Sequence, residues 1–323
     1  MAAETEVVGL GSCTVDFFAL VPKLIAAEEK INATRLEIHA GGVTANNLTQ
    51  VARLGATAGW IGLIGDDENG RIIQKEFAED GMDETGIEVV KGEHSSFTWI
   101  PVDEQGERSI YMFPNVTAKV TPKQIRTRFA RHIGQARHFH TEASQLPLPP
   151  VLEAIRVARE AGVRVIFDLD VDPTYFVEAG LGTKDELLEA LRLTDVLKPC
   201  KAAARELTSA SGYEQMARRL LTYGPKLVAI TMGVEGCLIA SNEGIAHAPP
   251  FRVKVVDTTG AGDAFMGGLS YALLQGWDDE RVGLFANACA ALCCTQVGAR
   301  AMAKLSEVNA FIQSNSPQAT SAD

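Results

Sequence analysis

The stretch Asp257-Thr258-Thr259-Gly260-Ala261-Gly262-Asp263-Ala264-Phe265 decides the fold of this chain. Residues 251–256 before it are rich in β-branched side chains and predict a strand. The apolar run 264–274 after it predicts a helix that Gly276 can end. A glycine-rich turn at the start of a helix directs free backbone N–H groups and the positive end of the helix dipole at one point. The sequence therefore predicts an anion-binding turn with the carboxylate of Asp263 on its rim.

An anion site with an adjacent base suits phosphoryl transfer to a hydroxyl group. The same turn also has a purely structural explanation, because glycines are common where a strand meets a helix. An aspartate at a helix start usually serves as a cap. The rest of the chain has to decide between the two.

Composition excludes several classes of function. The chain has 323 residues, of which 46% are apolar and 22% charged, as in a soluble globular enzyme. The net charge of −11 argues against a nucleic-acid partner. The nearest thing to a basic patch, formed by Arg126, Arg128, Arg131 and Arg137, is interpreted as a solvated helix face. The sequence contains no run of about 18 apolar residues, so it predicts no membrane-spanning helix.

The six cysteines include no Cys-x-x-Cys pair, and three of them, Cys289, Cys293 and Cys294, cluster in a predicted helix. Small buried side chains in a core helix explain this cluster better than a thiolate metal site, because no histidine is near in sequence. Such cysteine usage suits a reducing cytoplasm, where we expect the protein to act. His138 and His140 share one face of a predicted strand, and with no third ligand at zinc spacing they favour a packing or hydrogen-bonding role.

Strand-like and helix-like segments alternate over most of the length, which predicts an α/β fold with a Rossmann-like, doubly wound, mostly parallel sheet. The predicted strands are residues 7–11, 58–64, 137–140, 163–169, 196–197 and 227–232. The predicted helices are residues 45–54, 70–80, 150–161, 187–193 and 213–223.

Two segments, 17–39 and 95–115, break this alternation with short alternating stretches and a hairpin turn at 103–106. We expect them to pair into a small antiparallel sheet that forms a β-lid at the edge of the main domain. The main domain then comprises residues 1–16, 40–94 and 116–313. The polar tail 314–323 is predicted to be disordered.

Two further motifs suit a small-molecule site. In Gly41-Gly42-Val43-Thr44-Ala45-Asn46-Asn47, the paired glycines let the backbone approach a ligand, and Asn46 can hydrogen-bond it from the next helix. In Gly11-Ser12-Cys13-Thr14-Val15-Asp16, a strand end is followed by a carboxylate. Gly9-x-Gly11 could begin a dinucleotide-binding fingerprint, but the third glycine of that motif is absent. The sequence also contains no P-loop. Phosphate binding must therefore use another geometry.

Taken together, these motifs resemble the ribokinase-like, or PfkB, family of carbohydrate kinases over nearly the whole chain. The matching segments, in order, are 11–16, 41–46, 52–55 with 64–70, Lys198-Pro199, 231–236 and 257–265. The last is the family's signature. The order and spacing of all six argue against chance agreement.

The resemblance implies that Asp263 is the catalytic base and that the backbone of Gly260, Ala261 and Gly262 is the anion hole for the transferring phosphoryl group. The implied sugar contacts are Asp16, Gly41, Gly42, Asn46 and Glu142. The implied nucleotide contacts are Thr231, Gly233, Gly236 and, beside the adenine, Asn287. Asp257 and Thr259 match the ligands of a monovalent cation, such as K⁺, that many members bind.

The implied activity is ATP- and Mg²⁺-dependent phosphorylation of a sugar or sugar-acid hydroxyl under the lid, through which many members also form homodimers. One departure concerns the family's Asn-x-x-Glu after Lys-Pro, whose Glu helps to organise the magnesium-bound phosphates. Here Cys200 and Ala203 stand at these two positions, and Glu206, one helical turn further on, is a candidate substitute.

Two alternatives remain open at this point. In a nucleoside kinase of the same family, lid aromatics would stack on a base. Phe97, Trp99, Tyr111 and Phe113 are available, although packing within the lid also explains them. A catalytically weakened sugar- or nucleotide-binding regulator would account for the missing Asn-x-x-Glu, whereas the intact Asp263 argues for an active enzyme.

Overall fold

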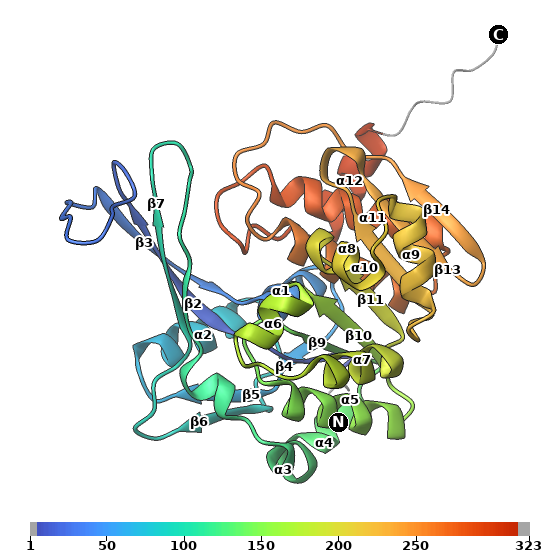
Figure 1. Cartoon of the computed structure of the whole chain (residues 1–323), viewed down its shortest axis with the longest axis horizontal. Helices are drawn as coiled ribbons and strands as arrows, with labels where there is room; N and C mark the ends of the chain where they lie inside the picture. The colour runs from blue at the N-terminus through green and yellow to red at the C-terminus, as the bar shows by residue number, and fades with distance from the viewer. Residues whose placement is uncertain (1–4, 316–323) are drawn as a thin grey trace.

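A mostly parallel sheet of eight strands forms the centre of the computed structural model, which describes residues 5–315 (Figure 1). The strand order is β14-β13-β12-β11-β10-β9-β1-β4, and the pairs from β12 to β4 are all parallel. The strands are β1 (Val7–Leu10), β4 (Ala58–Trp60), β9 (His138–Glu142), β10 (Arg164–Leu169), β11 (Val196–Pro199), β12 (Leu227–Thr231), β13 (Cys237–Ser241) and β14 (Gly244–Ala248). The predicted doubly wound sheet is confirmed.

Helices cover both faces of this sheet, because the central strands are apolar on both sides. Alternate residues enter opposite cores: Val8 packs into one and Val7 into the other. One face is covered by α5 (Leu148–Glu160), α7 (Lys184–Leu193) and α9 (Tyr213–Leu221). The other is covered by α1 (Val43–Arg53), α10 (Ala261–Leu274) and α11 (Asp279–Cys293). The remaining helices are α2 (Glu68–Glu79), α3 (Pro122–Gln124), α4 (Ala130–Gln135), α6 (Pro173–Glu178), α8 (Lys201–Thr208) and α12 (Leu305–Asn315), with short turns η1 (Asn115–Lys119), η2 (Ile125–Phe129) and η3 (Gly233–Glu235).

The two inserted segments form the second sheet, which projects from the main body (Figure 1). Its order is β3-β2-β7-β8, with β2 (Thr14–Leu20), β3 (Arg35–Gly41), β7 (Phe97–Val102) and β8 (Tyr111–Phe113). It differs from the prediction in one respect: β2 and β7 run parallel, so the sheet is mixed rather than antiparallel. Both insertions leave the main domain in the same direction, and their first strands therefore meet side by side.

Two predicted strands are wrong in detail. Residues 251–256 form no strand, because Pro249 and Pro250 end the β14 edge and no neighbouring strand supplies partners for the β-branched run. Residues 58–64 divide into β4 and β5 (Gly62–Gly65), and β5 pairs with β6 (Ile87–Val90) in a separate small sheet. Gly62, with a φ of 154°, lies where the chain leaves the main sheet.

The surface features agree with the composition. Arg126 pairs with Glu153 and Glu160, and Arg128 pairs with Glu88, as expected of a solvated helix face. No helix in the described part of the chain is both long and apolar enough to cross a membrane.

The predicted disordered tail, residues 314–323, begins within α12, which ends at Asn315. Residues 316–323 lie outside the described residues.

Candidate functional site

The glycine turn opens α10, as its sequence predicts. Gly260 is the N-cap residue with a φ of 79°, and a Cβ there would lie 2.3 Å from the carbonyl oxygen of Ala299. Only glycine therefore fits this position. A Cβ on Gly262, by contrast, would meet only the side chain of Lys198, with its Nζ 3.7 Å away. The Ala261 N–H donates to the Thr258 carbonyl at 3.2 Å, and the Ala264 N–H donates to the Gly260 carbonyl at 2.8 Å. The positive end of the helix dipole and the nearby Lys198 ammonium make the turn an electropositive site for an anion.

Asp263 lies in the first turn of α10 and is linked to α1. Asn46 Nδ2 donates to Asp263 Oδ2 at 2.8 Å, and Arg300 Nε donates to Asn46 Oδ1 at 3.1 Å. Burial raises the pKa of Asp263 well above its usual value, and the Asn46 hydrogen bond opposes this shift. Asp263 Oδ1 has no hydrogen-bond partner among the described residues and is available to accept a proton.

A buried ion pair lies behind the turn, at the carboxyl ends of β10 and β11. Lys198 Nζ is 2.6 Å from Asp168 Oδ1, and both side chains are at most 5% exposed. Burial alone would lower the pKa of Lys198, but the carboxylates of Asp168 and Asp170 outweigh it and raise this pKa. The ammonium group therefore stays charged beside Gly262, where it adds to the positive potential of the turn.

The predicted sugar contacts gather where β1, β9 and α1 meet the base of the lid. Asp16 Oδ1 accepts a hydrogen bond from Thr14 at 2.8 Å, and its other oxygen lies so close to Gly41 that a Cβ there would be 2.0 Å away. Glu142, fully buried at the end of β9, accepts from the Ser12 N–H at 2.8 Å. Burial raises the pKa of Glu142 to about 7.

Several polar atoms in this region are buried without a hydrogen-bond partner among the described residues. They are Glu142 Oε2 and the hydroxyl oxygens of Ser12, Thr44, Thr141 and Ser144. Buried polar groups are usually paired, and a group left unpaired calls for an explanation such as a ligand or an ordered water. A sugar, with its many hydroxyl groups, supplies the donors and acceptors that such a cluster lacks.

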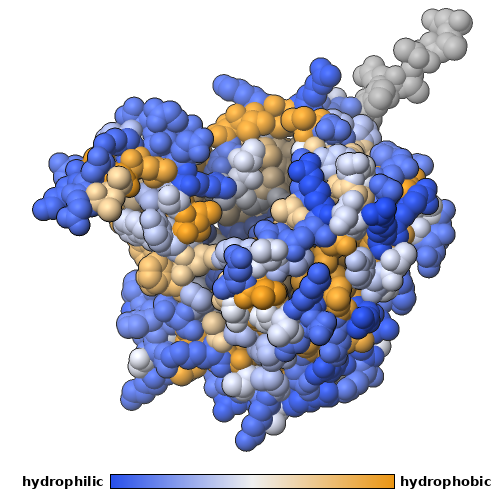
Figure 2. All heavy atoms as spheres, in the orientation of Figure 1, coloured by the Kyte–Doolittle hydropathy of each residue, from blue (hydrophilic) through white to orange (hydrophobic). Residues whose placement is uncertain are grey.

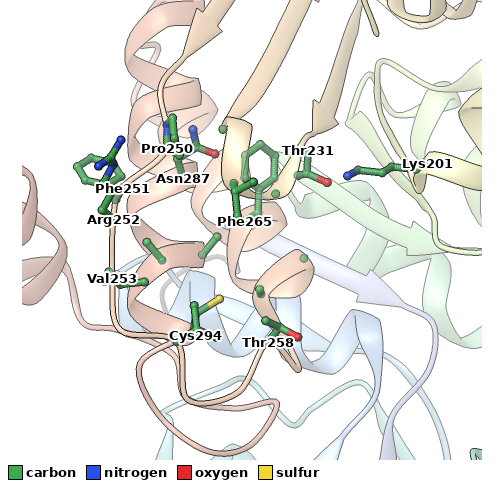
Figure 3. Close-up of a pocket in the computed structure, with 18 residues that line it drawn as sticks. Lys201, Thr231, Pro250, Phe251, Arg252, Val253, Thr258, Phe265, Asn287 and Cys294 are labelled. Carbon is green, nitrogen blue, oxygen red and sulfur yellow. The ribbon is translucent and has the colours of Figure 1, made fainter. Parts of the chain in front are cut away.

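A cavity of about 820 Å³ lies on the other side of the turn (Figure 3). It brings together the predicted nucleotide residues Thr231, Gly233, Gly236 and Asn287 with the turn residues Ala261 and Gly262. Lys201 and Thr231 extend into it from one side, and Phe251 and Val253 line the opposite wall (Figure 3). Asn287 Nδ2 donates to the carbonyls of Ala248 and Pro249, at 3.1 and 3.0 Å, which holds the loop that borders the cavity.

The predicted cation ligands lie beside the turn. Asp257 Oδ1 accepts from the N–H and hydroxyl of Thr259, at 2.9 and 2.7 Å, and its Oδ2 accepts from the Gly298 N–H at 3.0 Å. From the lid, Arg108 Nη1 donates to the Thr259 hydroxyl at 3.0 Å. The lid therefore reaches the anion turn directly.

The missing Asn-x-x-Glu has a visible local consequence. Cys200 caps α8, and its sulfur accepts a weak hydrogen bond from the Ala203 N–H at 3.4 Å. Glu206, the candidate substitute, accepts from the N–H and hydroxyl of Thr174 at the start of α6, at 3.3 and 2.9 Å. Its carboxylate is thus engaged away from the turn.

The two histidines and two of the three clustered cysteines lie in the core, as their patterns predict, whereas Cys294 is half-buried and lines the cavity. His138 and His140 are buried on β9, and burial lowers their pKa values to about 2 and 3. His138 Nδ1 is 3.1 Å from the Ser270 hydroxyl. All six cysteines are free, and Cys289 and Cys293 are buried within α11.

Sequence reasoning missed three side chains of this site. Lys198 stands in a recognisable motif that does not reveal its role, and Lys201, three residues later, carries no signal in the sequence. Arg300 contacts Asn46 from 254 residues away in sequence, and no motif marks it. A basic residue among small apolar neighbours, Gly298 to Ala303, was the one available signal.

Comparison with known proteins agrees with the geometry. A model of the pfkB family carbohydrate kinases matches residues 4–305. An aminoimidazole riboside kinase from Salmonella typhimurium is 34% identical over 292 residues, covering 85% of this chain and 88% of that protein. The chain spans only 48% of a bifunctional ribokinase/ribose-5-phosphate isomerase A from Fructilactobacillus sanfranciscensis, with 31% identity over 274 residues. The crystal structure of a putative ribokinase II from E. coli with ATP and Mg²⁺ has a TM-score of 0.84 and 26% identity, over 96% of this chain and 100% of that one.

Proposed function

The chain belongs to the PfkB family of carbohydrate kinases, which transfer a phosphoryl group to an alcohol, and we propose that it phosphorylates a sugar or sugar-acid hydroxyl with ATP. The observation that carries this proposal is that the turn of Asp263 connects two sites. Asp263 accepts a hydrogen bond from Asn46, one of the predicted sugar contacts, and the neighbouring Ala261 and Gly262 line the 820 Å³ cavity. An acceptor hydroxyl near Asn46 and a nucleotide in the cavity would therefore meet at this turn.

In the proposed mechanism, Asp263 accepts the proton of the acceptor hydroxyl as its oxygen attacks the γ-phosphorus of ATP and the bond to the ADP oxygen breaks. The N–H groups at Gly260, Ala261 and Gly262, together with Lys198, stabilise the charge on the transferring phosphoryl group. Asp16, Gly41, Gly42, Asn46 and Glu142 would hold the sugar, and Thr231, Gly233, Gly236 and Asn287 would hold the nucleotide.

The lid is proposed to close over the acceptor and to exclude water, which would otherwise compete for the phosphoryl group. Figure 2 shows the hollow in the surface beside the lid. The contact from Arg108 to Thr259 joins the lid to the anion turn. We keep the division into a main domain and a lid of residues 17–39 and 95–115 as part of this proposal.

The residues present also fit a magnesium-bound nucleotide. Mg²⁺ usually retains several waters and binds one or two carboxylates together with the substrate phosphates. Asp168 Oδ2 is buried without a partner among the described residues, and the charge of Asp170 acts on both Asp168 and Asp263. Asp168 and Asp170 would hold the metal, directly or through water, and the metal would supply charge neutralisation at the phosphates.

The test is ADP release with a panel of pentoses, hexoses, sugar acids and nucleosides at saturating Mg·ATP, with water alone as the blank. Acceptor-dependent turnover by a sugar or sugar acid supports the proposal. Turnover only with nucleosides favours the alternative that the riboside kinase relative suggests. Binding of ATP and sugars without turnover favours a regulator.

The lid aromatics support sugar over nucleoside. Phe97 stacks on Phe113 with ring centroids 4.3 Å apart, and Trp99 stacks on Phe17 at 6.5 Å. One face of each ring is therefore covered within the lid, although Trp99 and Phe113 remain partly exposed. Tyr111, at 56% exposed, has no ring partner among the described residues and remains available to stack on a base.

The lid also supports the proposal of a homodimer. Its exposed apolar side chains are Leu36, Ile38, Trp99, Ile110, Tyr111, Met112 and Phe113. By strand register, Leu36, Ile38, Trp99, Tyr111 and Phe113 share one face of the lid sheet, whereas Met112 lies on the other. Exposed apolar side chains that gather on one face favour an interaction site. Sedimentation equilibrium of the wild type and of Leu36→Glu measures the oligomeric state, and a wild-type monomer would contradict the proposed dimer.

The free cysteines support the proposed cytoplasmic location.

A monovalent cation is proposed to bind at Asp257 and the Thr259 carbonyl. Three donors occupy the Asp257 carboxylate, which offers about four lone-pair sites, so an oxygen ligand remains for a cation. Because the cation would fix the anion turn, K⁺ is expected to raise kcat. The measurement compares K⁺ with tetramethylammonium at constant ionic strength. Equal rates would remove the cation site and leave the kinase proposal intact.

Restoring the family motif with Cys200→Asn plus Ala203→Glu is expected to raise activity at low Mg²⁺. Asn is a strong helix N-cap residue, so the first change should not disturb α8. The second places a carboxylate at Ala203, which is fully buried at the start of α8. Directed from there toward the nucleotide phosphates, the carboxylate would be attracted to Mg²⁺ and repelled by the phosphates. The measurement is kcat/KM for ATP against free Mg²⁺, with Cys200→Asn alone as the control. An unchanged response would mean that Asp168 and Asp170 already fill this role.

A further inference from the structure

Arg300 contacts two of the proposed sugar-binding residues from a segment that no sequence motif marks. Its Nε donates to Asn46 Oδ1 at 3.1 Å, and its Nη2 lies 3.5 Å from the carbonyl oxygen of Gly41. The guanidinium also lies over the ring of Phe77, 5.4 Å from the centroid. These contacts fix the side chain between α1, α2 and the base of the lid.

The contact with Arg300 decides which end of the Asn46 amide faces Asp263. A guanidinium carries donors and no acceptor, so the Asn46 atom that meets Nε must be the carbonyl oxygen. The NH₂ group of the same amide then points to Asp263 and donates to Oδ2 at 2.8 Å. Without Arg300 the Asn46 oxygen loses its donor, and only the hydrogen bond to Asp263 itself still orients the amide.

The surroundings of Asp263 make this hydrogen bond important. Burial raises its pKa, and the neighbouring carboxylates of Asp170 and Asp168 raise it further. The hydrogen bond from Asn46 and the charge on Lys198 act in the opposite direction. A base must be ionised to accept a proton, and the Asn46 N–H is therefore one of two groups that keep Asp263 in its working state.

Arg300 itself is surrounded mainly by acidic groups. Burial lowers its pKa, and the carboxylates of Glu76, Asp80 and Asp16 oppose this effect. Arg300 is not among the groups that act on the pKa of Asp263 most strongly. The influence of Arg300 on the base therefore passes through Asn46 rather than directly through space.

We propose that Arg300 is a positioning residue, which holds Asn46 Oδ1 so that the Asn46 amide donates to Asp263 and keeps the carboxylate aimed at the acceptor hydroxyl. This inference rests on the proposed role of Asp263 as the base. Arg53 provides a matched control, because its Nη1 donates to the carbonyls of Arg300 and Met302 and so holds the same segment without touching Asn46.

The test follows the titration of Asp263 directly, by the ¹³Cγ resonance of protein labelled with [4-¹³C]aspartate and assigned by its loss in Asp263→Asn. Arg300→Met is expected to move the midpoint upward by about one pH unit, the size expected for the loss of one hydrogen bond to a carboxylate. Arg53→Met should leave the midpoint in place. In an Asn46→Ala background, Arg300→Met should add no further shift.

An unchanged midpoint in Arg300→Met, or an equal shift in Arg53→Met, would overturn the proposal. If Arg300→Met does not fold, Arg300→Lys replaces it. The ammonium keeps the buried charge but cannot reproduce the fork that holds Asn46 and Gly41 together, so a smaller shift in the same direction is expected.

In Arg300→Met, the acidic limb of the pH profile of kcat, measured with the best acceptor of the panel, should move to higher pH by the same amount as the Asp263 midpoint. A base with a raised pKa is protonated over a wider range, so activity is lost at a higher pH. The titration needs no substrate, so a shifted midpoint in a protein with no kinase activity would refute the proposed function alone. A raised KM with an unchanged acidic limb would make Arg300 a substrate contact and refute the positioning role.

Discussion

Asp263→Asn is expected to lower kcat by about 10²–10⁴-fold on the best acceptor, the usual cost of losing a general base. Asparagine has nearly the same shape as aspartate, so the glycine turn and the contact with Asn46 should persist. Asparagine cannot take a proton from the acceptor hydroxyl. The measurement is kcat at saturating Mg·ATP and acceptor, with calorimetric titration of both ligands to show that binding survives.

Asp278→Asn is the matched control for this change. Asp278 also stands at the start of a helix, where its side chain accepts from the Arg281 N–H at 2.8 Å, and it lies outside the proposed site. Asparagine caps helices as well as aspartate does, so this variant should keep wild-type activity. If Asp263→Asn retained more than a tenth of the wild-type kcat, Asp263 would not be the base.

The features that the sequence predicts well are local ones. The turn at Gly260, the paired glycines at Gly41 and Gly42, Asp16 in the segment after β1, and Glu142 at the end of β9 each depend on a few neighbouring residues. Parallel strands bring their carboxyl ends to one edge of the sheet, so local motifs that follow such strands converge without further information. The resemblance to a family implied the roles, and the structure brings Asn46 and the cavity-lining Thr231 and Asn287 to the same turn.

The features that the sequence does not predict depend on distant partners. Residues 251–256 have the side chains of a strand but no strand beside them, and β-propensity counts only when a partner is present. The parallel pairing of β2 with β7 joins segments about 80 residues apart in sequence, a spacing that no turn motif announces. Arg300 contacts Asn46 although the two are far apart in sequence, and no motif around either residue predicts this contact.

The buried pair behind the anion turn shows why a residue can matter to both stability and function. Lys198 has a role in the proposed chemistry because its ammonium lies beside Gly262. It has a structural role because Asp168 is 1% exposed and bonded to it at 2.6 Å. A deeply buried carboxylate is tolerated only with a partner, so the charge that serves the phosphoryl group also holds the ends of β10 and β11 together.

Lys198→Met is therefore expected to lower the free energy of unfolding by about 3–5 kcal/mol, the usual cost of removing one partner from a buried ion pair. Methionine fills a similar volume, but Asp168 then either stays ionised without a counter-charge or takes up a proton, and both states cost free energy. Adding Asp168→Leu should recover much of the loss, since an apolar pair leaves no buried charge unpaired. Denaturant unfolding at neutral pH measures all three proteins.

The control is Lys119→Met, which breaks the exposed pair with Glu93 and should cost no more than about 1 kcal/mol. A loss of that small size in Lys198→Met would mean that Asp168 does not need its partner. The double variant separates stability from nucleotide binding. Its stability should return while its affinity for Mg·ATP stays low, because the leucine and methionine pair packs the core but leaves the glycine turn without its ammonium group and the metal without the Asp168 carboxylate.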